Sequence, residues 1–94
     1  MIVASVCTGT RQQLMRKEGE PANITCPFSK PEWRTDKFPG KIFTDDTYFA
    51  AKNYLVIRNF TVNDEGIYKC YNSTHVMEFN ISVEGNFVLF RIIL

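Results

Sequence analysis

Several short segments of this chain alternate between apolar and polar residues, with turn-forming residues between them. The clearest segment is residues 22–28, whose polar side is formed by Asn23 and Thr25. Its apolar side consists of Ala22, Ile24, Cys26 and Phe28. A repeat of two residues places successive side chains on opposite faces of a β-strand, so the apolar side is expected to point into a core. No useful window shows the three-and-four spacing of an amphipathic helix, and the spacing of the turns predicts an all-β sandwich.

The alternation returns in residues 53–60. Leu55 and Ile57 lie on one face of this segment, and Tyr54 and Val56 lie on the other. Such a pattern is typical of a half-buried strand. We therefore expect Leu55 and Ile57 to point inward.

A polar corner at residues 62–66 precedes a strand in which Tyr68 and Cys70 share the inward face. A short turn at residues 72–75 follows, and residues 77–83 then alternate again. Two strands joined by so short a turn are expected to form a hairpin.

Length and charge exclude several classes of protein. With 94 residues the chain has room for one domain with a modest core. Eleven Lys and Arg residues against ten Asp and Glu residues give a net charge of +1, so nothing points to a nucleic acid or an anionic membrane surface as partner. No apolar stretch reaches the roughly 18 residues of a membrane helix.

Four asparagines begin the acceptor sequence for N-glycosylation, Asn-X-Ser/Thr. They are Asn23, Asn59, Asn72 and Asn80. One such sequence is weak evidence, but four in so short a chain favour passage through the secretory pathway. We therefore expect an extracellular glycoprotein, either secreted or displayed at the cell surface.

The two ends of the chain and the third cysteine keep several interpretations. Residues 1–6 are apolar. They are consistent with the remnant of a signal peptide, with a first strand, or with an artificial start of the expressed chain. Cys7 fits an unpaired thiol, an intermolecular disulfide or a residue removed with a signal peptide. Residues 87–94 fit a buried edge strand or a truncated membrane anchor. If the chain ends at Leu94, this segment is expected to pair with a sheet edge or a second copy.

Residues suited to catalysis or to metal binding are few. His75 is the only histidine and lies in the predicted turn, so a solvated residue is expected there rather than a catalytic base. Asp45 and Asp46 are adjacent, which would place them on opposite faces of a strand, so we expect a solvated loop. No zinc spacing or phosphate-binding loop occurs. We expect a non-catalytic protein with no cofactor, no metal and no small-molecule substrate.

The run Leu-x-Ile-x-x-Phe-x-x-x-Asp-x-Gly-x-Tyr-x-Cys, residues 55–70, resembles the E strand, EF corner and F strand of an immunoglobulin domain. The resemblance implies an immunoglobulin-like antiparallel sandwich. It also implies a core disulfide between Cys26 and Cys70, which are 44 positions apart. Asp64 and Gly66 would shape the corner, and the Tyr68 hydroxyl would return to the corner backbone.

Within this family, the chain is similar to strands D and E of variable-type domains, especially polymeric-immunoglobulin-receptor-like ones, in Gly40-Lys41-Ile42 followed by Asp45-Asp46 and then the strand at Asn53. The similarity implies that Lys41 opens strand D and pairs with Asp64. Trp33 is assigned to strand C, beside the disulfide. Too few residues separate it from Lys41 for a full set of C, C′ and C″ strands, so we expect a shortened front sheet. The Gly-x-Gly bulge of antigen-receptor domains is missing, so the chain does not resemble an antibody or T-cell-receptor variable domain.

We divide the chain into an N-terminal segment with a possible signal-peptide remnant and strand A (residues 1–16), the immunoglobulin-like domain (residues 17–84) and an apolar C-terminal segment (residues 85–94). The resemblance implies an extracellular protein-recognition domain of an immune-type receptor, or of a secreted or viral relative. The alternative is a structural or adhesive domain that mainly self-associates, as a homodimer. Membrane contact is expected only through a segment that is not complete in this chain.

The candidate partner surface consists of Phe43, Tyr54 and Val56. These residues would form an exposed apolar patch, or else a bland outer face that neighbouring side chains partly cover. A glycan on Asn23 would crowd the same sheet, and one on Asn80 would crowd the other. The protein ligand itself is unknown.

Overall fold

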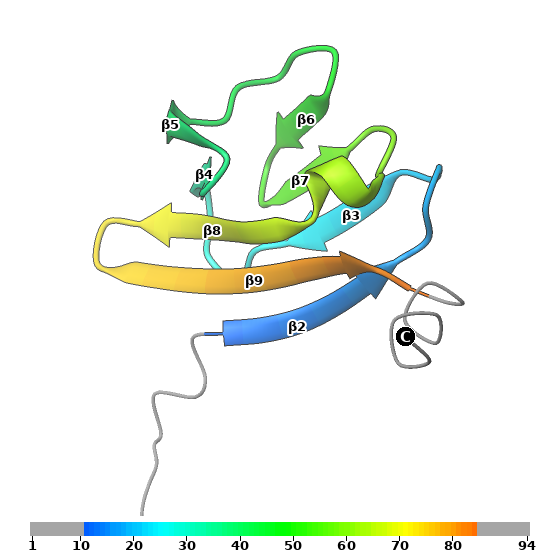
Figure 1. Cartoon of the computed structure of the whole chain (residues 1–94). Coiled ribbons are helices and arrows are strands. Elements are labelled where there is room, and N and C mark those ends of the chain that lie inside the picture. Colours follow the sequence, from blue (N-terminus) through cyan, green and yellow to red (C-terminus); the bar gives the residue numbers. More distant parts are fainter. Residues whose placement is uncertain (1–10, 85–94) are drawn as a thin grey trace, which may run out of the picture.

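The computed structural model describes residues 11–84, which form eight strands in two sheets (Figure 1). One sheet has five strands in the order β2-β9-β8-β4-β5, and the other has three in the order β3-β7-β6. The strands of the first sheet are β2 (Arg11–Arg16), β4 (Glu32–Thr35), β5 (Phe38–Lys41), β8 (Gly66–Asn72) and β9 (His75–Val83). Those of the second are β3 (Ala22–Thr25), β6 (Tyr48–Ala51) and β7 (Tyr54–Ile57). A short 3-10 turn, η2 (Val62–Asp64), connects the sheets before β8.

The core lies between the two sheets and is built by the inward positions of their strands. Leu55 and Ile57 on β7 have no exposed surface, as the alternation in this segment predicts. Tyr68 on β8 and Ile81 on β9 are equally buried. The other core residues are Ala22, Ile24, Cys26, Trp33, Ile42, Tyr48, Phe60, Cys70, Phe79 and Val83. The all-β sandwich inferred from the sequence is confirmed.

Strand β2 runs parallel to β9, from Arg11 opposite Glu78 to Arg16 opposite Val83. The pairing continues beyond the strand, because the Glu84 amide donates to the Arg16 carbonyl at 2.9 Å. Figure 1 shows β2 along the outer side of β9. The described fold therefore includes residues 11–16 as an edge strand of the five-stranded sheet.

Strand β8 and strand β9 form the predicted hairpin. Asn72 is paired with His75, so only Ser73 and Thr74 make the turn. The register continues antiparallel to the pair Gly66 and Ile81. Residues opposite each other in this register point to the same face, so the outward side chains of β8 and β9 share one face of the five-stranded sheet.

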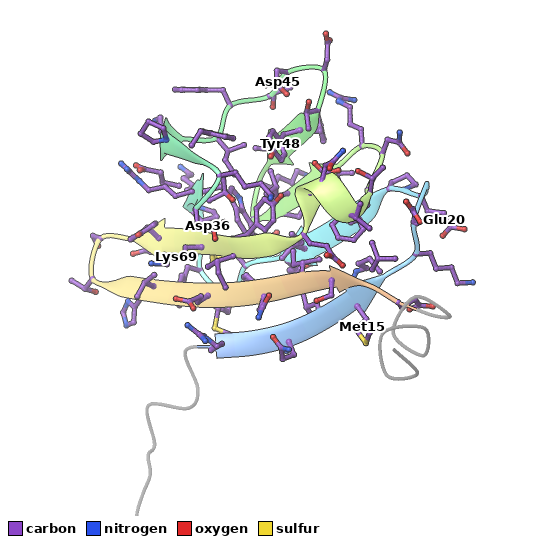
Figure 2. The ribbon with its side chains drawn as sticks, in the orientation of Figure 1. Met15, Glu20, Asp36, Asp45, Tyr48 and Lys69 are labelled. Carbon is purple, nitrogen blue, oxygen red and sulfur yellow. A yellow bond between two sulfur atoms is a disulfide. The ribbon has the colours of Figure 1, made fainter. Side chains whose placement is uncertain are left out.

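Strand β6 was missed by the sequence analysis, and a side-chain turn positions its start. The Asp45 carboxylate accepts hydrogen bonds from the Thr47 and Tyr48 amides, both at 2.8 Å (Figure 2). These backbone donors, Tyr48 first, lower the pKa of Asp45. Lys52, with φ of 52°, then turns the chain back into β7. Asp45 thus begins a loop, as expected, and its hydrogen bonds fix the loop backbone at the start of β6.

Three regions discussed from sequence, residues 1–6, Cys7 and residues 87–94, lie outside the described residues. Within residues 11–84, no helix is long and apolar enough to cross a membrane.

Candidate functional site

The predicted disulfide joins Cys26 to Cys70 across the core, with the two Cα atoms 6.2 Å apart. Trp33 lies on β4, directly opposite Cys70 in the register, and is 3% exposed. Its ring packs against Phe79 with centroids 6.1 Å apart. The assignment of Trp33 to the strand beside the disulfide agrees with this register.

The corner before β8 has the predicted tyrosine contact. The Tyr68 hydroxyl donates to the Asp64 carbonyl at 2.7 Å, and burial raises the pKa of Tyr68. Gly66 has φ of 145°, and a Cβ atom there would lie 3.0 Å from the Asp36 carboxylate. Glycine is therefore required for both the conformation and the close approach.

The prediction that Lys41 pairs with Asp64 is wrong. Lys41 ends β5, opposite Arg34 in the five-stranded sheet, so residues 40–42 do not open strand D. Its ammonium lies over the Phe43 ring, 5.2 Å from the centroid. Asp64 instead accepts hydrogen bonds from the Thr61 amide at 3.0 Å and the Thr61 hydroxyl at 3.3 Å. The carboxylate caps η2 and needs no distant cation.

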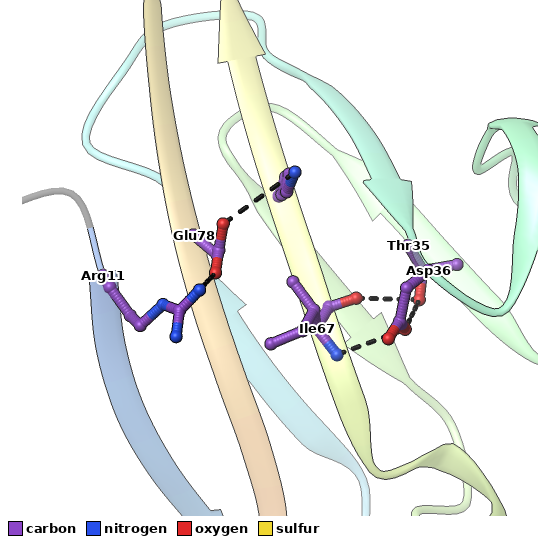
Figure 3. Close-up of polar contacts among 6 residues, drawn as sticks. Arg11, Thr35, Asp36, Ile67 and Glu78 are labelled. Atoms are coloured by element: carbon purple, nitrogen blue, oxygen red, sulfur yellow. Dashed lines mark hydrogen bonds and ion pairs between the residues drawn. The ribbon is translucent and has the colours of Figure 1, made fainter.

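The front sheet is shortened, as expected, because a single strand follows β4 in it. One four-residue strand, β5, follows β4 before the chain crosses to β6 in the other sheet. At one end of the β4–β8 ladder, the Thr35 hydroxyl donates to the Ile67 carbonyl at 2.9 Å and the Ile67 amide donates to Asp36 at 3.3 Å (Figure 3).

The predicted partner surface is divided by the fold. Tyr54 and Val56 lie on the outer face of β7, where Phe49 of β6 is opposite Val56. The Phe49 and Tyr54 rings pack with centroids 6.1 Å apart. We call Phe49, Tyr54 and Val56 the apolar strip. Phe43 follows β5 instead, is 66% exposed, and has its ring contact with Lys41.

A different group of side chains gathers on the outer face of the five-stranded sheet. Arg34 of β4 lies over the Tyr71 ring of β8, 5.8 Å from the centroid, and its Nε is 2.6 Å from the Glu32 carboxylate. Lys69 lies opposite Arg34 in the register. We call Glu32, Arg34, Lys69 and Tyr71 the Arg34–Tyr71 patch.

The patch borders a hollow of about 650 Å³. The hollow is lined by Ser29, Lys30, Glu32, Arg34, Tyr71, Asn72 and Ser73. Alternation along β8 already predicts that Lys69 and Tyr71 point outward. Their meeting with Arg34 depends on the register between β4 and β8, which no local pattern encodes.

Charged side chains continue this face toward β2. Glu78 of β9 pairs with Arg11 of β2 (Figure 3) and lies 3.8 Å from the Lys69 ammonium on β8. These two ion pairs link three adjacent strands, β2, β9 and β8. This part of the outer face of the five-stranded sheet is therefore charged, in contrast to the apolar strip on the other sheet.

The four glycosylation sequences lie at different depths. Asn23 and Asn59 are exposed, whereas Asn72 and Asn80 are half-buried. The Asn72 side-chain amide donates to the Ser29 carbonyl at 3.0 Å. Asn80 lies on β9 between Gln13 of β2 and Ile67 of β8.

The described residues do not assemble a metal site or a catalytic triad. No group of three or more His, Cys, Asp or Glu side chains in residues 11–84 is arranged to hold a metal ion. His75 is exposed, with Nδ1 3.0 Å from the Thr74 hydroxyl and its ring 5.3 Å from the Phe28 centroid. Within residues 11–84 no carboxylate contacts the His75 ring, as a catalytic triad would require.

The fold as a whole is similar to solved structures at low sequence identity. The fold is immunoglobulin-like. The N-terminal four Ig domains of Dscam1 isoform 4.44 align with a TM-score of 0.65 and 19% identity over 82% of this chain. Domain I81 of titin aligns with a TM-score of 0.60 and 18% identity, covering 80% of this chain and 88% of that one.

This immunoglobulin-like chain spans 23% of the four-domain Dscam1 fragment. It also aligns with the N-terminal eight Ig domains of Down Syndrome Cell Adhesion Molecule isoform 1.30.30, with a TM-score of 0.62 and 16% identity over 85% of this chain and 14% of that one. No protein-family model and no curated protein matches the sequence. Likeness at such identity concerns the fold, and the variable-type, polymeric-immunoglobulin-receptor-like subclass stays a prediction.

Proposed function

We propose that this immunoglobulin-like domain recognises a protein outside the cell and binds it through the Arg34–Tyr71 patch. The observation that carries the proposal is the stack of Arg34 on Tyr71 beside an open hollow. Arginine and tyrosine are enriched among the residues that dominate binding energy at protein interfaces, and such residues often fill or border pockets.

The exposed basic groups around the patch favour a partner that presents carboxylates or carbonyls. The Arg34 side chain is 46% exposed although Glu32 contacts it, so its remaining donors can reach a partner carboxylate or carbonyl. Lys30 also lines the hollow and is exposed. Complementary charges at an interface mainly raise the association rate and the specificity. Binding by this patch is therefore expected to weaken as salt rises.

Two features support an extracellular location. The Cys26–Cys70 bond is fully buried in the core, and core disulfides persist mainly in oxidising compartments. Two of the four glycosylation sequences place their asparagines on the exposed surface. An immune-type receptor, or a secreted or viral relative, is the class of protein we assign on these grounds and on the sequence resemblance.

The test is saturable binding of the glycosylated domain to an array of secreted and cell-surface ectodomains that includes the domain itself. Tyr71→Ala and Arg34→Ala are each expected to weaken binding by about tenfold or more. Lys17→Ala is the charge-matched control, because Lys17 is exposed in the turn before β3. Figure 2 labels Glu20 in this turn, at the end of the sandwich away from the β8–β9 hairpin.

A heterologous partner that depends on Tyr71 and Arg34 but not on Lys17 would support recognition through the patch. Binding that ignores both substitutions would contradict it. Saturable binding to the domain itself alone would favour the adhesive alternative.

A further inference from the structure

The outer face of the three-stranded sheet carries an apolar strip on β6 and β7, beside the polar Asn23 and Thr25 of β3. In antiparallel sheets the outward positions usually hold polar residues. Here the outward positions of β6 and β7 include the apolar strip, and Phe49 is 36% exposed. Arg58 extends over the Phe49 ring at 5.6 Å and covers one side of it. Phe49, Tyr54 and Val56 adjoin one another, so they form one patch rather than scattered apolar residues.

The register places a glycosylation sequence directly beside the strip. Asn23 of β3 is opposite Val56 of β7, and Val56 is opposite Phe49 of β6. In the next row, Thr25 is opposite Tyr54. Both functional residues of the sequence Asn23-Ile24-Thr25 therefore lie on the face that contains the strip.

The spacing is short enough for a sugar chain attached at Asn23 to lie on the strip. Residues opposite each other in an antiparallel pair have Cβ atoms about 5 Å apart, and the second strand adds about 5 Å. Asn23 is exposed and its side chain has no protein hydrogen bond among the described contacts. The Asn23 carbonyl accepts from the Arg16 guanidinium at 3.3 Å, which leaves the side-chain amide available.

We propose that Asn23 is N-glycosylated and that its glycan lies over Val56, Phe49 and Tyr54, shielding the apolar strip. The amide nitrogen of Asn23 loses a proton and bonds to C1 of the first sugar of a lipid-linked oligosaccharide donor, while the bond between C1 and the phosphate oxygen breaks and the lipid diphosphate leaves with the electron pair. Apolar C–H faces of the first sugars pack on the strip while their hydroxyls remain in water. The proposal rests on the extracellular part of the proposed function, because the modification requires the secretory pathway.

The shield assigns different roles to the two sheets. The face of β3, β6 and β7 is closed to proteins, whereas the Arg34–Tyr71 patch lies on the other sheet. Tyr54 and Val56, suggested by sequence as a partner surface, would then contact the glycan. A partner protein would be directed to the five-stranded sheet.

The test uses a matched pair of substitutions at Thr25 in protein secreted from mammalian cells. Thr25→Ser keeps the acceptor sequence, and Thr25→Ala removes it without changing Asn23. Mass spectrometry of the peptide measures occupancy at Asn23. Hydrophobic-interaction chromatography and sedimentation measure exposure of the strip and association.

We expect Thr25→Ala and Asn23→Gln to elute later from the hydrophobic column and to associate as concentration rises, and Thr25→Ser to behave as the wild type. Adding Phe49→Ser to Thr25→Ala should restore early elution and the monomer. Asn59→Gln removes a glycan from a loop instead of this face, so it should change neither measurement.

Two results overturn the shield while leaving the extracellular proposal intact. One is an unmodified Asn23 in a secreted protein whose Asn59 is modified. The other is a modified Asn23 whose removal changes neither elution nor association. If none of the four sequences is modified, the shield and the secretory location fail together.

Discussion

At the scale of single residues, the Tyr68 hydroxyl is the polar group on which the corner most depends. It is buried and donates to the Asp64 carbonyl at 2.7 Å. Tyr68→Phe leaves that carbonyl without its donor, so the free energy of unfolding should fall by about 1–3 kcal/mol in urea titrations. Tyr54→Phe is the control, because Tyr54 lies half-buried on the outer face, and it should change little.

Tyr68→Phe should also change how the free energy of unfolding depends on alkaline pH. Burial raises the pKa of Tyr68 above its ordinary value of 10.0, so the unfolded chain ionises first as pH rises. The stabilisation is fully present below about pH 10 and declines as pH rises through the folded pKa. Equal alkaline slopes for the wild type and Tyr68→Phe would contradict this assignment.

Asp45 is predicted to make the free energy of unfolding depend on pH in acid. Amide donors from Tyr48 and Thr47 hold its pKa below the ordinary value of 3.8. Its stabilisation is therefore present above about pH 4 and declines as pH falls through the folded pKa. The stability difference between the wild type and Asp45→Ala should shrink in acid, whereas exposed Asp46→Ala should differ little at any pH.

At the scale of elements, the short turn η2 is stabilised by its own Thr61 and Asp64. Asp64→Ala should lower the free energy of unfolding by about 1 kcal/mol, since it removes the capping interaction. Lys41→Ala should cost less than about 0.5 kcal/mol, because Lys41 is exposed on edge strand β5.

A double-mutant cycle distinguishes this account from the Lys41–Asp64 pair that the sequence resemblance implied. Independent sites should give a coupling below about 0.5 kcal/mol. A coupling free energy well above that value would show that Lys41 and Asp64 do form an ion pair and that β5 lies elsewhere.

The strands that sequence could predict are those whose inward residues alternate with polar ones. Ile24 on β3 and Leu55 on β7 were placed correctly because a period of two is a local property of the chain. Residues 38–41 and 48–51 lack that alternation, so β5 was mistaken for strand D and β6 was missed. The Arg34–Tyr71 patch depends on pairing between strands that are far apart in sequence, which local patterns do not specify.

At the scale of the whole molecule, the Cys26–Cys70 bond is expected to supply a large share of the stability. It closes a loop of 44 positions, which is worth about 4 kcal/mol in the chain-entropy model, against a typical total of about 5–15 kcal/mol. Replacing both cysteines with alanine should lower the free energy of unfolding by roughly that amount. A loss below about 1 kcal/mol would show that the two sheets hold together without the bond.

The five-stranded sheet is proposed to bind a protein, and the three-stranded sheet is proposed not to. Photo-crosslinking on intact cells compares the two faces directly, with a photoreactive phenylalanine at position 71 or position 54 of the glycosylated domain. We predict a saturable crosslinked protein from position 71 that excess unlabelled domain competes away, and none from position 54. Competed crosslinks from position 54 with none from position 71 would contradict the account.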